Sequence, residues 1–122
     1  MDINVHQSSS YQFTSYSDSS VTINNIEYHN NIIVTNTEVI NFQVNNIHDL
    51  ELSHLDKIIQ GKPDLIIFGT GMQIIYPDFK LLEKLNQLSI GFEVMPIQAL
   101  CRTYNFLISE DRKIVCILFF SQ

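Results

Sequence analysis

The sequence has little charge, four glycines, three prolines, two cysteines and no tryptophan among its 122 residues. The charged fraction of 16% is below the usual value of about a quarter, and Asn, Ser and Thr supply much of the missing polarity. Cys101 and Cys116 form no Cys-x-x-Cys arrangement and have apolar neighbours. The sequence therefore predicts two reduced thiols, packed as small hydrophobic groups in a reducing compartment, rather than a disulfide framework.

Positive charge is also scarce. The formal net charge is −6, and Arg112-Lys113 is the one adjacent pair among seven scattered basic residues. Such a chain repels polyanions on average, so neither nucleic acid nor an anionic membrane surface is an expected partner.

Long apolar runs are missing as well. None approaches the ~20 residues that cross a bilayer, and residues 1–6 lack the basic and apolar regions of a signal peptide. We therefore expect a soluble cytoplasmic protein with no direct membrane insertion.

The length of the chain fits one domain that spans residues 1–122. Residues 1–10 are polar and are expected to be flexible. Residues 11–50 are rich in Asn, Ser, Thr and β-branched residues, which favours strands, whereas residues 51–122 carry Leu, Lys and Glu in helical phase. Neither part is long enough to bury a core alone.

The first half predicts short strands. Tyr11, Phe13 and Tyr16 indicate an edge strand, and segments 21–23 and 26–28 flank Asn24-Asn25, which suits a two-residue hairpin turn. Residues 32–35 are typical of a buried strand, while the apolar stretch 39–42 has no clear period.

One helix is expected near residue 53, with Ser53 as its cap and Asp56 three residues later as a weak capping-box echo. Its inward side chains would be Leu55, Ile58 and Ile59, and Gly61 would end it. A second helix should begin near Pro77-Asp78. Its predicted inward residues are Phe79, Leu81, Leu82, Leu85 and Leu88.

Three more segments complete the pattern. Residues 64–68 are apolar on both faces, as in a central strand, and Gly69-Thr70-Gly71 would break that strand. Residues 92–95 and 114–120 predict further strands, and an apolar stripe with a period near 3.6 predicts a helix over 97–109. The fold class is therefore α/β. We expect a three-layer sandwich with a mixed central β-sheet, an antiparallel N-terminal hairpin and about three helices.

The Gly69-Thr70-Gly71 stretch is a candidate binding loop. Glycines after a strand allow a sharp turn and let backbone N–H groups approach a ligand. However, the third glycine of a dinucleotide site and the Lys-Ser/Thr pair of a P-loop are missing. A tight turn required by packing is the simpler interpretation, and phosphate binding is the alternative.

Gln98 and Arg102 are the other candidate ligand-binding residues. Loops after neighbouring parallel strands share one edge of the sheet, where ligands bind. Arg102 stands off the apolar stripe of the predicted helix and would face an anion held by Gly69, Thr70 and Gly71. In the alternative interpretation Arg102 pairs with Glu93, or with another carboxylate, and fixes the helix to the sheet.

No complete catalytic or metal-binding set is visible. No His lies within forty residues of Cys101 in sequence, and the helical stripe places this thiol on the buried face. The histidines His6, His29, His48 and His54 all lie in the first half, and Glu51-x-x-His54 is a single copy of a di-iron spacing. We predict no catalytic residues, no metal and no cofactor.

Phe119 and Phe120 are adjacent in a predicted strand. Successive side chains of a strand point to opposite faces. Either both faces of the sheet are covered there, or one ring is exposed at a surface for a partner or a second copy of the chain.

Three stretches together resemble one family: Pro-Asp-Leu-Ile-Ile-Phe-Gly-Thr-Gly over 63–71, Gly-Phe-Glu-Val-Met over 91–95 and Ala-Leu-Cys-Arg-Thr-Tyr-Asn over 99–105. A Tyr76-Pro77 pair lies between the first two. The chain is similar here to the domain of unknown function 498 family, the small Mth938-like bacterial and archaeal proteins, to which the mitochondrial complex I assembly factor 3 belongs. The resemblance covers about residues 61–118.

The resemblance implies a compact three-layer α/β fold with a mixed sheet, and it implies no established catalytic residue and no cofactor. The mitochondrial relative implies a role in assembling a membrane-bound complex. The chain departs from the family at Ile97, where Thr is usual, so a hydroxyl at this position is not available to cap the helix or to touch a ligand.

The sequence therefore predicts a non-enzymatic protein-binding or complex-assembly domain. Its partners would be proteins, with a membrane-associated complex as one hypothesis and a homo-oligomer as another. The alternative is an enzyme or a small-molecule (anion) binding protein that uses the loop 69–71 and Arg102.

Overall fold

The computed structural model describes residues 11–120; the prediction of a flexible segment 1–10 falls outside them. The strands are β1 (Phe13–Tyr16), β2 (Val21–Ile23), β3 (Ile26–Tyr28), β4 (Ile32–Val34), β5 (Val39–Asn41), β6 (Leu65–Thr70), β7 (Gly91–Met95) and β8 (Ile114–Phe119). The helices are α2 (Asp56–Gln60), α3 (Phe79–Gln87) and α4 (Ile97–Leu107), with short 3-10 helices η1 (Ile47–Asp49), η2 (Leu52–Leu55) and η3 (Ile108–Glu110).

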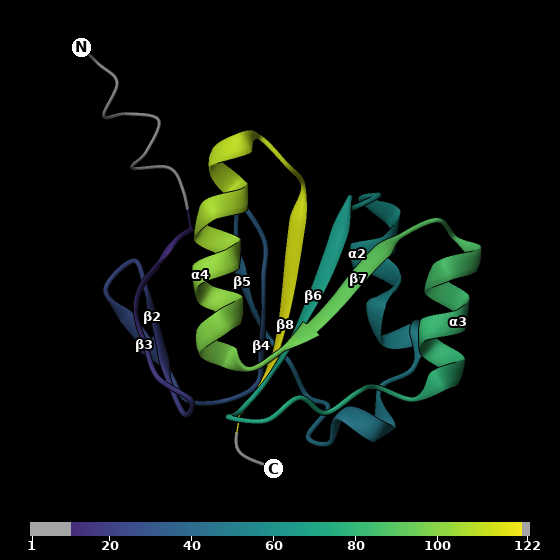
Figure 1. The fold of residues 1–122 in the computed structure, drawn as a ribbon, viewed down its shortest axis with the longest axis horizontal. Coiled ribbons are helices and arrows are strands. Elements are labelled where there is room, and N and C mark those ends of the chain that lie inside the picture. The colour runs from purple at the N-terminus through teal and green to yellow at the C-terminus, as the bar shows by residue number, and fades with distance from the viewer. Residues whose placement is uncertain (1–10, 121–122) are drawn as a thin grey trace.

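The central sheet has five strands in the order β5-β4-β8-β6-β7. Strand β6 pairs in parallel with β7 and β8, whereas β4 is antiparallel to β5 and β8, so the sheet is mixed as predicted. Strands β1, β2 and β3 form a separate antiparallel sheet beside α4, rather than an extension of the central sheet (Figure 1). The three-layer α/β class is confirmed, and the small sheet adds to the layer of α4.

Each face of the central sheet carries its own hydrophobic cluster. Ile67 points to the side covered by α4 and the small sheet, while Ile66 and Phe68 point to the side covered by α2 and α3. The alternation follows from the period of two in a strand. It explains why residues 65–68 are apolar throughout, because both faces are covered.

Phe119 and Phe120 show the same alternation. Phe119 belongs to the α3-side cluster, where its ring meets the Phe42 ring edge to face at 5.7 Å, and Phe120 belongs to the α4-side cluster. Both rings are buried. Of the two alternatives, the covered sheet is the correct one.

The predicted hairpin turn is present. Asn24 and Asn25 both have positive φ, 51° and 68°, which is the backbone of a type I′ turn. The turn joins β2 to β3 in direct register, with Ile23 opposite Ile26.

The start of the first helical segment differs from the prediction. Ser53 lies inside η2, and Glu51 caps this segment through a reciprocal pair of bonds with His54. The Glu51 N–H donates to the His54 Nδ1 at 2.9 Å. The Glu-x-x-His spacing, considered above as half of a metal motif, is thus used as a capping box.

The end of α2 also differs. Gly61 stands at the C-cap with an ordinary helical φ of −74°, while the next residue, Lys62, takes the left-handed conformation at φ 52°. Glycine is the usual residue for that position, so the glycine stands one place too early for the pattern.

Helix α3 buries Leu81, Leu82 and Leu85 as predicted. Phe79 and Leu88 are exposed instead, so these two assignments were wrong. Phe79 precedes the stripe by two residues and therefore points to the opposite side of the helix. Leu88 lies at the C-cap, and Ser89 turns the chain away with φ 61°.

Two boundaries shift along the chain. Gly69 and Thr70 do not break β6 but complete it, since they pair with Leu118 and Phe119 of β8. Helix α4 ends at Leu107 and tightens into η3, after which Asp111 turns the chain at φ 60°.

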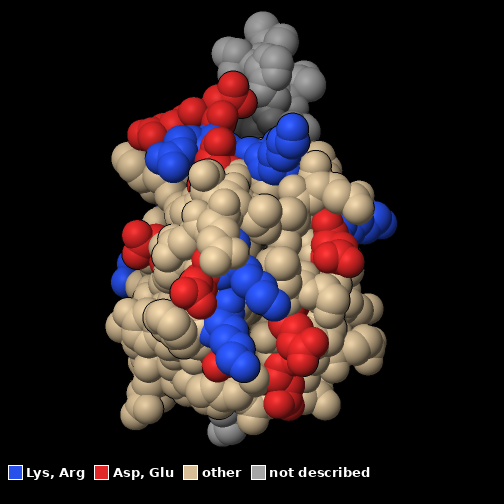
Figure 2. Space-filling model, turned by 90° about the vertical axis from the view of Figure 1, so that its right-hand side faces the viewer, with Lys and Arg blue, Asp and Glu red and all other residues tan. Residues whose placement is uncertain are grey.

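The surface has no large region of one charge sign on the side that α3 faces. Acidic and basic side chains lie interspersed there, with extensive uncharged surface between them (Figure 2). Within residues 11–120, none of the helices has both the length and the apolar character that a bilayer span requires.

Candidate functional site

Thr70 organises the carboxyl end of β6. It is fully buried, and it is the one buried polar side chain of the part of the chain that the structure describes. Its hydroxyl donates to the Gln73 carbonyl and accepts from the Ile75 N–H at 3.1 Å. Because both hydrogen-bonding functions are used internally, Thr70 holds the following segment in place.

The two glycines beside Thr70 have different reasons to be there. A Cβ on Gly69 would lie 2.7 Å from Leu100 Cδ1, so this glycine lets α4 pack closely on β6. Gly71 has φ +34° and open space around it. Its N–H donates to the Phe119 carbonyl at 3.3 Å, and its carbonyl accepts from the Ile97 N–H at 3.0 Å. Packing therefore explains Gly69, although as a residue of β6 and not as part of a tight turn.

Residues 72–79 expose large apolar side chains. Met72 is 73% exposed, Ile74 53%, Tyr76 58% and Phe79 72%. Between them Ile75 packs against the α3-side cluster and Pro77 is buried. Gln73 is exposed as well, so exposed and less exposed residues alternate only from Ile74 to Pro77. The side chains that face solvent in this segment include large apolar ones, whereas polar ones are usual there.

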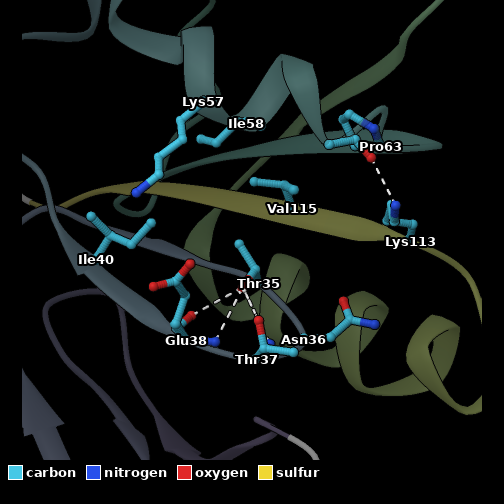
Figure 3. A pocket seen from close by; sticks show the side chains of 11 residues that line it. Thr35, Asn36, Thr37, Glu38, Ile40, Lys57, Ile58, Pro63, Lys113 and Val115 are labelled. Atoms are coloured by element: carbon cyan, nitrogen blue, oxygen red, sulfur yellow. Dashed lines mark hydrogen bonds between the residues drawn. The ribbon is translucent and has the colours of Figure 1, made fainter.

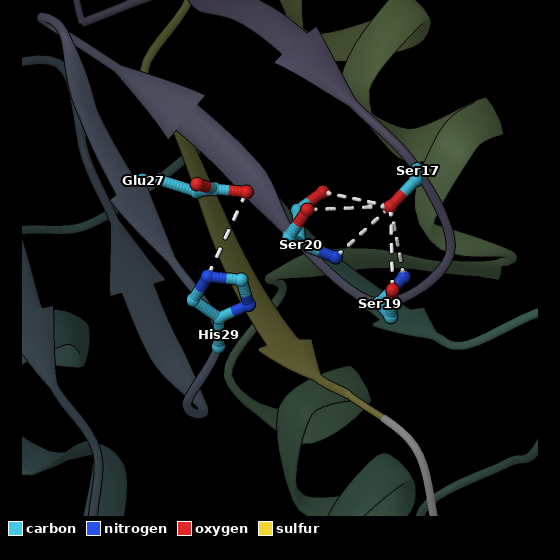
Figure 4. A network of polar contacts seen from close by, with 5 residues as sticks. All are labelled: Ser17, Ser19, Ser20, Glu27 and His29. Carbon is cyan, nitrogen blue, oxygen red and sulfur yellow. Dashed lines mark hydrogen bonds and ion pairs between the residues drawn. The ribbon is translucent and has the colours of Figure 1, made fainter.

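A depression of about 340 Å³ lies beside this segment, lined by Asp18, Ser19, Thr70, Gly71, Met72, Gln73 and Ile75. Asp18 and Ser19 come from the turn between β1 and β2. Ser17 Oγ accepts the N–H groups of Ser19 and Ser20, both at 3.2 Å, which fixes this turn (Figure 4). The depression thus brings a carboxylate to the end of β6.

Gln98 and Arg102, the other predicted site residues, are exposed on α4. Neither lines the depression beside Thr70. Among residues 11–120, the one close contact between a basic and an acidic side chain joins His29 Nε2 to Glu27 Oε2 at 3.6 Å, and it is an ion pair only when the His is protonated. Arg102 therefore has no carboxylate partner there, and Glu93 does not pair with it. The structure thus leaves the Arg102 side chain available to solvent.

A second hollow, of about 390 Å³, lies at the opposite end of the parallel strands. Figure 3 shows Lys57 and Ile58 of α2 on one side of it, Thr35, Asn36, Thr37 and Glu38 on the other, and Val115 between them. Lys113 Nζ donates to the Gly61 carbonyl at 2.7 Å at its margin. Ile40, Ile58 and Val115 give the hollow apolar lining, and its charged side chains are Glu38, Lys57 and Lys113.

Both cysteines are buried and free, as predicted. Burial raises the pKa of Cys101 from 9.0 to about 12, and the nearby Arg102 offsets only part of this effect. Burial also raises the pKa of Cys116 well above its ordinary value. A nucleophilic thiol needs the opposite shift, so neither cysteine has the environment of a nucleophile.

Metal-binding geometry is not found in the described range. Between residues 11 and 120 no three His, Cys, Asp or Glu side chains are placed to hold an ion together. His54 caps η2 and His29 pairs with Glu27, while His6 lies outside the described residues.

Sequence reasoning missed Asp18 and the outward face of residues 72–79. Asp18 is distant in sequence, and only the docking of the small sheet brings it to β6. A signal for the exposed side chains was present, since Met72, Ile74 and Tyr76 stand at every second position of the sequence.

Two proteins of known sequence resemble this chain. One is a protein of Francisella tularensis subsp. holarctica named 13 kDa major membrane protein, 29% identical over 108 residues, covering 87% of this chain and 88% of that protein. The other is a Drosophila melanogaster protein named NADH dehydrogenase (ubiquinone) 1 alpha subcomplex assembly factor 3, 29% identical over 84 residues. That match covers 66% of this chain and 43% of the fly protein, so the chain spans less than half of that relative.

Solved structures share the fold closely. A Xanthomonas campestris protein superposes with a TM-score of 0.84 at 26% identity, covering 98% of this chain and 92% of that one. A Bordetella parapertussis protein gives a TM-score of 0.82 at 25% identity, with 93% and 98% covered. A Mth938-like domain of Bordetella pertussis, at 22% identity and a TM-score of 0.74, supports the fold alone.

The family resemblance seen in the second half of the sequence extends over almost the whole described chain. The family model described as "Protein of unknown function (DUF498/DUF598)" matches residues 13–119. This chain therefore belongs to the DUF498/DUF598 family.

Proposed function

We propose that this protein is a non-enzymatic binding domain that takes part in assembling a protein complex, and that it contacts its partner through residues 72–79. The observation that supports the proposal most directly is the ordered row of apolar side chains at Met72, Ile74, Tyr76 and Phe79, each more than half exposed. Several large apolar side chains exposed within one short segment are typical of interaction surfaces. Tyr is also among the residues enriched at the energetic centres of interfaces.

The names of the relatives support a role in assembly and a complex that is associated with a membrane. The fly protein carries the words assembly factor in its name, and the Francisella protein is named a membrane protein. We therefore propose that the partner belongs to a membrane-associated complex.

The test is capture of the partner by the intact protein. A variant with Met72→Ser, Ile74→Ser and Tyr76→Ser removes the apolar face without touching the buried Ile75 and Pro77. The wild-type protein should retain a stoichiometric partner in chemical crosslinking followed by mass spectrometry, and the variant should lose it. Unchanged capture by the variant would refute the proposed surface.

A matched control removes exposed apolar side chains elsewhere. Ile26 is 55% exposed on the small sheet and Leu88 is 47% exposed after α3. An Ile26→Ser/Leu88→Ser protein should capture the partner like the wild type. Sedimentation of the same three proteins tests self-association, because a dimer formed through residues 72–79 would become a monomer in the first variant only.

A second candidate function follows from Arg102, which is exposed and has no ion-pair partner within residues 11–120. In this alternative Arg102, Gln98 and the loop Gly69-Thr70-Gly71 bind a small anion. A titration with inorganic phosphate, followed by amide chemical shifts, should then move the signals of residues 69–71 and 98–102. Arg102→Ala should abolish the response while the fold stays intact.

A further inference from the structure

We propose that the depression beside Thr70, together with the apolar row of residues 72–76, binds an extended protein segment that carries a Lys or Arg side chain among apolar ones. The cationic side chain would meet Asp18, and its apolar neighbours would cover Met72, Ile74 and Tyr76. This inference rests on the proposed binding function and names the chemistry of the partner.

The charge of the depression selects a cation. Asp18 is the one charged residue among its lining residues, and no Lys, Arg or His of residues 11–120 pairs with it. Asp78 adds a second exposed carboxylate after the apolar row, while Lys80 follows Phe79 as the one cation of segment 72–80. With a net charge of −6 on the chain, a cationic partner is attracted over a long range as well.

Asp18 is presented by a rigid turn. Ser17 closes the turn through its own N–H, which donates to the Ser20 carbonyl at 2.9 Å, and through its hydroxyl, which accepts two backbone N–H groups (Figure 4). A partner therefore orders little of this chain when it binds, which lowers the entropic cost of association.

Some backbone N–H and carbonyl groups of the apolar row lack hydrogen-bond partners within the described residues. In the part of the chain that the structure describes, no hydrogen bond involves the N–H or carbonyl groups of Met72 or Ile74. An extended segment laid along this row would satisfy these groups as an added strand does. Lipid chains offer no such partners and leave backbone groups unpaired at a cost, so the observations favour a protein segment over a membrane.

The experiment uses three acetylated and amidated heptapeptides as probes. The first is Val-Thr-Arg-Thr-Val-Thr-Val, in which the Arg shares one face with the Val side chains, and the other two replace the Arg by Gln or by Glu. Each peptide is titrated into the isotope-labelled full-length protein, and amide chemical shifts give both the location and the dissociation constant.

We expect the Arg peptide to shift the amides of residues 17–20 and 70–79. The Gln peptide should bind about fivefold more weakly, the upper end for a solvent-accessible ion pair, and the Glu peptide more weakly still. Asp18→Asn should reduce the affinity for the Arg peptide to that for the Gln peptide. Glu110→Gln, which removes a negative charge at η3, should change neither affinity.

Three results would overturn the inference: equal binding of the Arg and Gln peptides, no effect of Asp18→Asn, or shifts confined to β5 or β7. Binding to phosphatidylcholine vesicles that is lost in the Met72/Ile74/Tyr76 serine variant would assign the row to lipid instead. The cation preference can fail while the proposed function stands. If the serine variant loses its captured partner while Asp18→Asn retains it at wild-type affinity, the surface stands and the cation preference is wrong.

Discussion

At Gly69 the backbone of β6 lies against α4 without room for a methyl group. The nearest atom to a Cβ built there is Leu100 Cδ1 at 2.7 Å, and Ile97 Cγ1 follows at 3.5 Å. Both neighbours are fully buried, so neither moves aside easily. The close approach sets the depth at which α4 sits on the sheet.

Gly69→Ala should therefore destabilise the protein by about 1–3 kcal/mol, the usual cost of overpacking a core. Urea unfolding of the purified variant measures this change. In a Leu100→Ala background the clashing atom is gone, so the added cost of Gly69→Ala should fall well below its value in the wild type. Equal costs in both backgrounds would contradict the contact.

The buried thiols should make the stability of the protein depend on pH in the alkaline range. The pKa of Cys101 is raised to about 12 in the folded protein against 9.0 for an exposed thiol, and that of Cys116 is raised as well. The unfolded chain then releases these protons first as the pH rises. The contribution of the thiols to stability is complete below pH 9 and is lost through the window from 9 toward 12.

We predict that the free energy of unfolding falls between pH 9 and pH 10.5, by up to about 1.4 kcal/mol per pH unit for each thiol. Urea titrations at three pH values measure the slope. A Cys101→Ala/Cys116→Ala protein is less stable throughout but should show a shallower decline, although the raised pKa of Tyr104 leaves part of it. Identical slopes would exclude the thiols as the cause.

At the scale of single residues the sequence predicted burial better than contact. Cys101, Leu100 and Tyr104 are buried as the helical stripe indicated. The close approach of α4 to Gly69 and the position of Asp18 beside the end of β6 depend on how elements distant in sequence pack together, and no local sequence pattern encodes that packing. The interpretation of Arg102 as an ion-pair partner of Glu93 failed for the same reason.

Asn105 of α4 holds strand β1 through two hydrogen bonds. Asn105 Oδ1 accepts the Phe13 N–H at 3.0 Å, and its Nδ2 donates to the Phe13 carbonyl at 2.8 Å. The Phe13 ring then meets the Tyr104 ring edge to face at 5.4 Å. Asn105 therefore acts toward β1 as a neighbouring strand would, and it completes the edge of the small sheet.

Asn105→Ala should cost about 1–3 kcal/mol, because two backbone groups of Phe13 lose their partner. Hydrogen exchange should show faster exchange of the Phe13 amide and unchanged protection in β6 and β8. Asn86→Ala, at an exposed position of α3, serves as the control. Loss of protection across the whole chain would mean that β1 is not an independent unit.

Among the elements, those with a strong period were predictable. The stripes of α3 and α4, the hairpin at Asn24-Asn25 and strand β8 all follow local rules. The η2–α2 segment was harder because its cap is a Glu-His pair rather than Ser53. Its glycine also stands one residue before the left-handed position that Lys62 occupies.

For the whole molecule, the sheet order could be predicted only in part. The sequence of strands and helices in the second half indicated parallel neighbours around β6, and that is correct. The separation of β1, β2 and β3 into a second sheet was not predicted, since a hairpin pattern is the same whichever sheet it joins. The apolar face of residues 72–79 was missed because solvent exposure is a property of the assembled fold.

Strand β8 should be indispensable to that fold. It is the middle strand of five and pairs with both β4 and β6, and its side chains enter both hydrophobic clusters. A chain that ends at Arg112 should lack cooperative thermal unfolding and near-UV circular dichroism, because both cores stay open. A cooperative transition in this shortened chain would show that the remaining strands fold without it.

The position of β8 has a consequence for biosynthesis. A ribosome releases every other strand and helix of this fold before the one that holds the sheet together. Until then β4 and β6 have no strand between them, and their apolar side chains are open to wrong pairings and to holdase chaperones. Growth temperature and translation speed along the codons of β8 should therefore influence the yield of native protein more than changes along the codons of β1.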